Sequence, residues 1–160
     1  TGRGKTRIGK QGKKKPPPWF DQWSDAIDTC FWDSDIEAAL WSKMAINCII
    51  NPLTALHNCA NGELSQRRDL ITQVTTLCGE VSKVTRAAGF TELAAALPQL
   101  VAAVIAATAN NRSSMLQDVE NGRRTEIDYI TGFLLRVADQ HDIDAPHNRA
   151  LLKSIKSNEC

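Results

Sequence analysis

The sequence predicts an all-α domain preceded by a short stretch of strand and linker, on three observations. After residue 33, apolar side chains recur every three or four residues, the spacing of one face of an α-helix. No stretch of that region alternates apolar and polar residues as a half-buried strand does. The first 18 residues are rich in Gly, Lys and Pro and cannot fold alone. A chain of 160 residues with 42% hydrophobic content can bury one core.

The helical region begins with one long apolar segment. Asp33 or Ser34 is the helix start signal, and the segment runs from residue 36 to about residue 58 with Pro52 inside it. A second helix follows, and Gly89 is placed to end it because glycine readily adopts the left-handed conformation that closes many helices. The apolar face of this second helix consists of Leu70, Ile71, Val74, Leu77, Cys78, Val81 and Val84.

Two further helices are predicted in the middle of the domain. An alanine-rich helix covers about residues 91–108, and Pro98 predicts a break or a kink in it because proline lacks the N–H donor that a helix interior needs. The stretch SSMLQDVENG then predicts a short helix that ends at Gly122.

The last two helices have clear start signals. Thr125 can cap the first of them, with Asp128 three residues later in the manner of a capping box. Its apolar face consists of Ile127, Ile130, Phe133, Leu134 and Val137. The final helix begins near Asp144, has Pro146 in its first turn, and is expected to bury Leu151, Leu152 and Ile155.

Charge and cysteine content exclude several classes of protein. Residues 1–20 hold seven of the 19 basic residues and no acid, so the helical body is acidic although the net charge is +1. The five cysteines are odd in number and form no Cys-x-x-Cys pair, which argues against a disulfide framework and a zinc site. The three histidines lack metal-ligand spacing. No apolar run is long enough for a membrane span or a signal peptide, so we expect a cytoplasmic protein with no membrane partner.

A narrow polar stripe interrupts the long apolar segment. Lys43, Asn47 and Asn51 are four residues apart, and an α-helix advances about 100° per residue, so the three side chains share one face. One interpretation is that this face is only the solvent-exposed edge of the helix. The other is that the amides are needed there, since asparagine is a poor helix former.

These residues lie in motifs that resemble a known family. KMAINCIINPLTAL, NCANGEL, SSMLQD, RRTEIDYITGFLL and APHN, in this order, resemble the C-terminal helical domain of ketopantoate reductase (2-dehydropantoate 2-reductase). The likeness covers about residues 33–156. It implies a multi-helix domain of the 6-phosphogluconate-dehydrogenase-like type at residues 33–160. Residues 1–32, which include TGRGKTRIG, then resemble the end of the nucleotide-binding (Rossmann) domain plus a linker.

The resemblance also implies an activity. Members of the family reduce ketopantoate to pantoate with NADPH, for pantothenate and coenzyme A synthesis, and bind the cofactor mainly through a Rossmann domain. No Gly-x-Gly-x-x-Gly unit stands in this sequence, so we expect a piece of a longer enzyme that is inactive alone. Lys43 matches the general acid of the family, and partial burial would lower its pKa towards neutrality. The alternative is an ordinary surface lysine.

Other family positions are matched residue by residue. Asn47, Asn51 and Asn61 match positions that bind the substrate, although Asn61 also fits an ordinary turn. Ser114 matches a residue that holds the substrate carboxylate, and a helix N-cap is the alternative. Glu126 matches an acidic residue on the cofactor side, and an interaction with a helix dipole is the alternative.

Two rival functions are compatible with parts of the sequence. The first is a non-catalytic helical interaction or dimerisation module with the same fold. The second is binding of single-stranded nucleic acid, because tryptophans follow the KKKPPP run. The acidic residues around those tryptophans favour packing instead, so we expect no nucleic-acid partner. The expected partners are a small 2-keto acid and a second copy of the chain in a homodimer.

Overall fold

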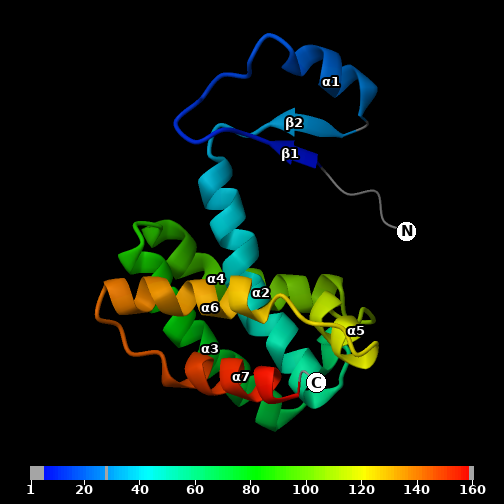
Figure 1. Cartoon of the computed structure of the whole chain (residues 1–160), viewed down its shortest axis with the longest axis vertical. Helices are drawn as coiled ribbons and strands as arrows, with labels where there is room; N and C mark the ends of the chain where they lie inside the picture. The colour runs from blue at the N-terminus through cyan, green and yellow to red at the C-terminus, as the bar shows by residue number, and fades with distance from the viewer. Residues whose placement is uncertain (1–5, 28, 159–160) are drawn as a thin grey trace. The chain divides into compact units, whose positions relative to one another are not determined.

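The computed structural model describes residues 6–27 and 29–158 (Figure 1). Part of the TGRGKTRIG motif and Cys160 therefore lie outside the described residues. The chain divides into two compact units, residues 1–41 and 42–160, with the boundary inside helix α2. In chain order the elements are β1 (Thr6–Ile8), α1 (Phe20–Ala26), β2 (Cys30–Trp32), α2 (Ile36–His57), the 3-10 helix η1 (Asn61–Ser65), α3 (Arg68–Ala87), α4 (Thr91–Ala107), α5 (Ser114–Glu120), α6 (Ile127–Gln140) and α7 (Pro146–Ser157).

The first unit is a small strand–helix–strand motif. β1 and β2 pair in parallel, and helix α1 lies between them in the chain, as a parallel pair requires a crossover connection. The ring of Phe20, which is buried, packs edge-on against Trp32 with 5.6 Å between ring centroids. Gly9 follows β1, and a Cβ atom there would lie 2.4 Å from the Cβ atom of Ile36. The predicted short strand segment before the helical domain is therefore present.

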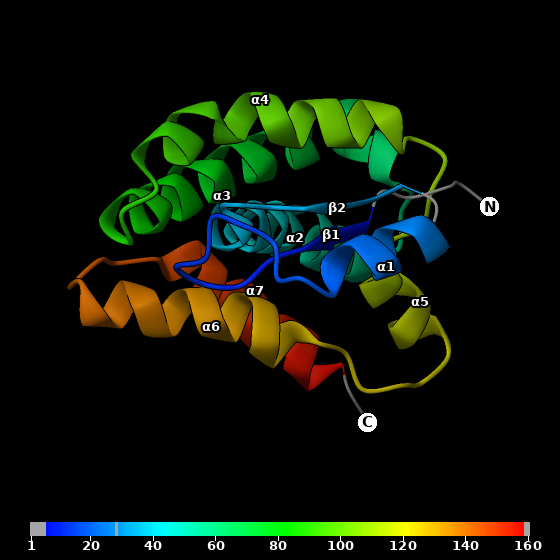
Figure 2. The same ribbon diagram turned by 90° about the horizontal axis from the view of Figure 1, so that it is seen from above.

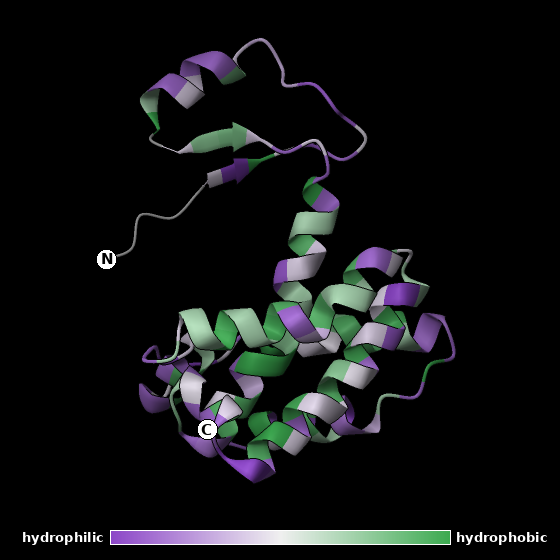
Figure 3. Cartoon of the chain, turned by 180° about the vertical axis from the view of Figure 1, so that it is seen from behind, coloured by the Kyte–Doolittle hydropathy of each residue, from purple (hydrophilic) through white to green (hydrophobic). Residues whose placement is uncertain are grey.

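The second unit is all-α, as predicted. Seen from above, the C-terminal half of α2 passes between the α3–α4 pair and the α6–α7 pair (Figure 2). Hydrophobic and hydrophilic residues both appear on the helices of this unit (Figure 3), and the hydrophobic ones fill the core. The core is made of fully buried side chains from every long helix, among them Ile49, Leu53, Leu70, Leu97, Leu134 and Ile155. Burial of these faces is the main force that holds the helices together.

The start of α2 differs from the expectation. Neither Asp33 nor Ser34 caps the helix, which begins at Ile36. The Ala38 N–H instead donates to Oδ1 of Asp35 at 3.3 Å, so Asp35 acts as the cap. The Oδ1 atom of Asp33 accepts from the N–H of Asp35, which orders the preceding turn.

The sequence predicted a break or a kink at Pro98; the break is wrong, and the kink stays a prediction. Helix α4 is continuous on both sides of this residue, just as α2 is continuous through Pro52. Proline removes one N–H donor from the helix ladder. Leu97 and Val101 on either side of Pro98 are almost completely buried, so packing holds the helix together across the missing hydrogen bond.

Helix ends follow the predicted signals with one correction. Gly89 and Gly122 adopt φ of 95° and 60°, which ends α3 and α5 as expected. The N–H of Ile127 donates to Thr125 Oγ1 at 3.3 Å, but the N-cap position of α6 is Glu126 and not Thr125. Asp128 accepts a hydrogen bond from Lys156 on α7 at 2.9 Å, and that bond lowers the pKa of the Asp128 carboxyl.

The N-terminus of α7 is capped by a residue from another helix. Glu80 on α3 is buried. Its carboxylate oxygens accept hydrogen bonds from the backbone N–H groups of His147 and Asn148, with N–O distances of 2.9 Å in each case. The carboxylate also accepts hydrogen bonds from two side-chain nitrogens, Nδ1 of His147 and Nδ2 of Asn148. Burial by itself raises the pKa of Glu80, but these hydrogen bonds prevail and the pKa lies below its ordinary value.

The described residues include neither a membrane-spanning helix nor a metal-binding cluster. None of their helices combines the length and the apolar character that a membrane crossing requires. Within the same part of the chain, no three His, Cys, Asp or Glu side chains are grouped so that they could hold a metal ion.

Candidate active site

The polar stripe of α2 runs from the surface into the core. Lys43 is exposed, Asn47 is half-buried and Asn51 is only 7% exposed. With a rise of about 1.5 Å per residue, each step between them is roughly 6 Å along the helix. Because Asn51 is buried, the stripe is more than the solvent-exposed edge of a helix.

Lys43 stands at the open end of this stripe. Its ammonium forms no hydrogen bond or ion pair with any residue that the structure describes. The sequence left partial burial of Lys43 and an ordinary surface position as alternatives, and the side chain is exposed. An unpaired ammonium is free to donate a proton or a hydrogen bond to a ligand.

At the buried end, the stripe is connected to α5 through Thr54. Its Oγ1 atom lies 2.9 Å from the Ile50 carbonyl oxygen and 3.0 Å from that of Asn51. The same atom lies 2.7 Å from Oγ of Ser113, which is 59 residues further along the chain. Thr54 is completely buried, so this hydrogen bond joins two segments inside the core.

The capping role at α5 belongs to Ser113 and leaves Ser114 free. The Leu116 N–H donates to Oγ of Ser113 at 3.1 Å, and Ser113 has the extended backbone of an N-cap. Ser114 is the first residue of the helix and is exposed. The N-cap alternative for Ser114 is therefore wrong.

Glu126 faces Ser114 from the start of α6. It occupies the N-cap position of that helix, but its carboxylate makes no capping hydrogen bond. Ser114 Oγ instead lies 3.5 Å from Glu126 Oε1, a long contact between two exposed side chains. The carboxylate and the hydroxyl are close enough to bind one ligand together.

Asn61 is held differently from the other two asparagines. It is buried at the start of η1, and its Nδ2 donates to Thr108 Oγ1 at 2.9 Å. The adjacent Gly62 lies so close to Ala109 that a Cβ atom on the glycine would be 2.9 Å from the Cβ atom of Ala109. Among the described residues, none donates to Oδ1 of Asn61. Asn61 therefore fastens η1 to the end of α4, and its contact with substrate stays a prediction.

The structure thus connects five of the six predicted site residues, all except Asn61. Lys43, Asn47 and Asn51 share one face of α2, and contacts lead from there through the Thr54–Ser113 pair to Ser114 and Glu126. Sequence reasoning missed Thr54 and assigned the capping possibility to the wrong serine of the pair. The order Ser-Ser before an apolar helix was the only signal, because either serine fits an N-cap by type.

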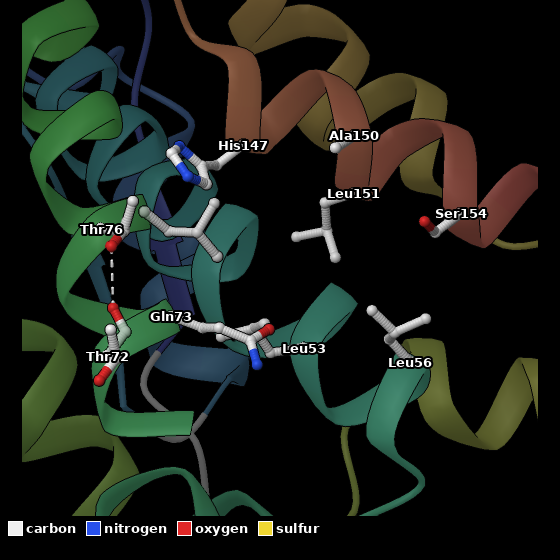
Figure 4. Close-up of a pocket in the computed structure, with 10 residues that line it drawn as sticks. Leu53, Leu56, Thr72, Gln73, Thr76, His147, Ala150, Leu151 and Ser154 are labelled. Atoms are coloured by element: carbon white, nitrogen blue, oxygen red, sulfur yellow. Dashed lines mark hydrogen bonds between the residues drawn. The ribbon is translucent and has the colours of Figure 1, made fainter. Parts of the chain in front are cut away.

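Two cavities of the second unit lie away from these residues. One, of about 300 Å³, is lined by residues of α2, α3 and α7 (Figure 4), and Leu53, Leu56 and Leu151 form its apolar wall. Another, of about 530 Å³, lies between α3 and α4 and includes Cys78. None of the predicted site residues lines either one.

The buried cysteines are not suited to nucleophilic chemistry. Burial raises the pKa of Cys78 to about 11, so the thiol stays protonated near neutral pH. Burial likewise raises the pKa of Cys48 and of Cys59.

Comparison with known proteins gives a consistent result. A family model described as ketopantoate reductase PanE/ApbA C terminal matches residues 35–159. The 2-dehydropantoate 2-reductase of Yersinia pestis is 45% identical over 139 residues, which are 87% of this chain and 45% of that protein.

Solved structures show the same similarity. The crystal structure of a probable 2-dehydropantoate 2-reductase from Bacillus subtilis has a TM-score of 0.71 and 35% identity, covering 81% of this chain and 43% of that one. A dimeric ketopantoate reductase from Staphylococcus aureus shares the fold, with a TM-score of 0.73 at 21% identity over 91% of this chain and 52% of that one. The chain spans about half the length of the proteins that it matches.

Proposed function

The chain belongs to the ketopantoate reductase family, and from this premise we propose that it is the substrate-binding and catalytic helical domain of an NADPH-dependent 2-dehydropantoate 2-reductase. The proposed reaction reduces ketopantoate to pantoate, for pantothenate and coenzyme A synthesis. We place it in the cytoplasm together with that biosynthesis. The homodimer expected from the sequence remains part of the proposal, with the dimeric S. aureus protein as its support.

One observation carries the proposal. The stripe on α2 ends next to the buried hydroxyl pair that holds α5, and α5 presents Ser114 beside Glu126. A cation, amides, a hydroxyl and a carboxylate are therefore all provided by adjoining elements. A 2-keto acid with a hydroxyl group needs this combination, because its carboxylate, its ketone and its hydroxyl each require different partners.

Each of the proposed site residues has a role in the reaction that suits its chemical group. When the ketone is reduced, negative charge develops on its oxygen, and an alkoxide is unstable unless a proton reaches it. The exposed ammonium of Lys43 donates that proton to the ketone oxygen and polarises the carbonyl before the transfer. Asn47 and Asn51 both donate and accept, so their amides suit the hydroxyl and keto groups. The Ser114 hydroxyl donates to the substrate carboxylate.

The cofactor belongs to the proposal as well. NADPH supplies the hydride when bound, and most of its contacts are expected from a Rossmann domain that the described residues do not include. Within the described chain, Glu126 is the residue that fits it. Its carboxylate is exposed and makes no capping hydrogen bond, so it can accept from hydroxyl or amide groups of a dinucleotide.

The non-catalytic module is the less favoured alternative. A packing or dimerisation domain needs apolar faces, but it has no use for an unpaired lysine in line with a buried asparagine. The relatives that match the chain are reductases, which also favours the enzyme.

The test uses a full-length protein that contains this chain. NADPH oxidation with ketopantoate is measured by absorbance for wild type, Lys43→Ala and Lys83→Ala. Lys83 is an exposed lysine on α3 and serves as the matched control. We expect Lys43→Ala to lower kcat by roughly a hundredfold or more, the scale of general acid catalysis, and Lys83→Ala to leave it unchanged. A wild-type protein without ketopantoate reduction contradicts the proposed function, and a near-normal Lys43→Ala rate removes Lys43 from the mechanism.

A further inference from the structure

The hydroxyl pair of Thr54 and Ser113 has no role yet in the proposed reaction. Thr54 is completely buried and Ser113 is 7% exposed, and their oxygens are 2.7 Å apart. Polar groups in a core cost stability unless they are hydrogen-bonded, so a buried contact between two distant segments needs a reason.

The hydrogen bonds of the pair can all be satisfied in one arrangement. Each hydroxyl carries one proton and two lone pairs. Ser113 Oγ already accepts from the Leu116 N–H. If the Ser113 hydroxyl donates to Thr54 Oγ1, the Thr54 proton is free for the carbonyl oxygens of Ile50 and Asn51, at 2.9 and 3.0 Å. The pair is therefore a complete network and not a chance contact.

This network connects two residues that the proposed function assigns to substrate. One end is the backbone carbonyl of Asn51, whose side chain belongs to the stripe on α2. The other end is Ser113, which is covalently bonded to Ser114 and caps the short helix α5. α5 has only seven residues, so its N-terminal position depends strongly on its cap.

We propose that Thr54 is a positioning residue, which sets the spacing between Asn51 and Ser114 and thereby the length of 2-keto acid that fits between them. This inference rests on the proposed function. Thr54 itself is buried and touches no substrate, so it acts only through these two neighbours. Without the Thr54 hydroxyl, the separation between Asn51 and Ser114 is no longer fixed, and binding of the substrate weakens.

The experiment compares Thr54→Val, which has the same shape without the hydroxyl, with Thr54→Ser, which keeps the hydroxyl. Both are made in the full-length protein and assayed for kcat and for KM of ketopantoate and NADPH. We expect Thr54→Val to raise KM for ketopantoate roughly tenfold while kcat changes by less than about threefold, because binding groups that act equally in ground and transition states affect KM. KM for NADPH stays unchanged, and Thr54→Ser restores most of the ketopantoate affinity.

A purely structural role predicts another pattern. Partial unfolding lowers the amount of active enzyme, so apparent kcat falls while KM stays the same. Selectivity gives a further readout: Thr54→Val should lose part of its preference for ketopantoate over the same branched keto acid without the terminal hydroxyl. Thr75→Val is the matched control, since Thr75 Oγ1 bonds only the Ile71 carbonyl oxygen of its own helix.

A double-mutant cycle with Ser113→Ala tests whether the two hydroxyls act together. If they do, the KM of the double variant exceeds that of the more affected single variant by less than about twofold. Additive effects, an unchanged KM in Thr54→Val, or equal effects of Thr54→Val and Thr54→Ser each overturn the inference. Failure of the proposed function is distinguished by the wild type, which then does not reduce ketopantoate at all.

Discussion

The buried carboxylate of Glu80 provides the sharpest test of how the second unit is held together. Glu80→Gln keeps the shape of the side chain but replaces one acceptor oxygen with an NH₂ group. Four donors of His147 and Asn148 face the carboxylate, at 2.7 to 2.9 Å. In the variant, the NH₂ group of the glutamine faces two of these donors and cannot accept hydrogen bonds from them. The cap of α7 is therefore partly lost.

The magnitude follows from these contacts. A hydrogen bond to a charged group contributes about 1.5–3 kcal/mol, and a donor left unsatisfied in the core costs about 1–3 kcal/mol. Since such contributions are not additive, we expect Glu80→Gln to lower the free energy of unfolding by about 2–4 kcal/mol. For a chain of this length, that corresponds to a fall in Tm of roughly 5–12 °C.

The effect should depend on pH in a defined direction. The pKa of Glu80 lies below its ordinary value of 4.5 in the folded protein, so the folded state favours the ionised form. The stabilisation is complete above the unfolded pKa and is lost as pH falls through the lower folded pKa. The difference in free energy of unfolding between wild type and Glu80→Gln is therefore largest at neutral pH, and it shrinks progressively as the pH falls below about 4.5.

Thermal unfolding followed by circular dichroism measures the stability difference, and amide hydrogen exchange locates it. The amides of His147 and Asn148 should exchange faster in Glu80→Gln. Glu92→Gln is the control, because Glu92 is an exposed first-turn residue of α4. If both variants have the same Tm, or if the Glu80→Gln effect is as large in acid as at neutral pH, the capping role of the carboxylate is refuted.

Two more outcomes are expected. Gly62→Ala should destabilise the protein by about 1–3 kcal/mol in chemical denaturation, because its Cβ atom would lie 2.9 Å from that of Ala109, whereas Gly79→Ala, with open space around it, should not. The 160-residue chain assayed alone should oxidise no NADPH with ketopantoate, and activity there would mean that the cofactor site lies within it.

Helical periodicity in the sequence was enough to predict the all-α fold and most helix ends. The apolar faces of α3, α6 and α7 predicted the buried side chains well, because a helix that must bury one face shows it at fixed spacing. The exceptions are Ile71 on α3 and Phe133 on α6, which share the apolar spacing but are 41% and 37% exposed, and Val74 and Leu152, which are half-buried. The polar stripe on α2 was visible for the same reason of spacing, although its gradual burial was not.

What the sequence could not determine depends on contacts between segments far apart in the chain. The sequence suggested Ser114 as the possible cap and left Ser113 unconsidered, whereas in the fold Ser113 caps α5 and lies against Thr54 of α2. Nothing in the local sequence distinguishes Glu80 from other helical glutamates. Its role as a cap appears only in the fold, which places the start of α7, 67 residues later in the chain, against its carboxylate. Local spacing determines which face of a helix is apolar, whereas the partner of a buried hydroxyl or carboxylate is decided by which helix packs there.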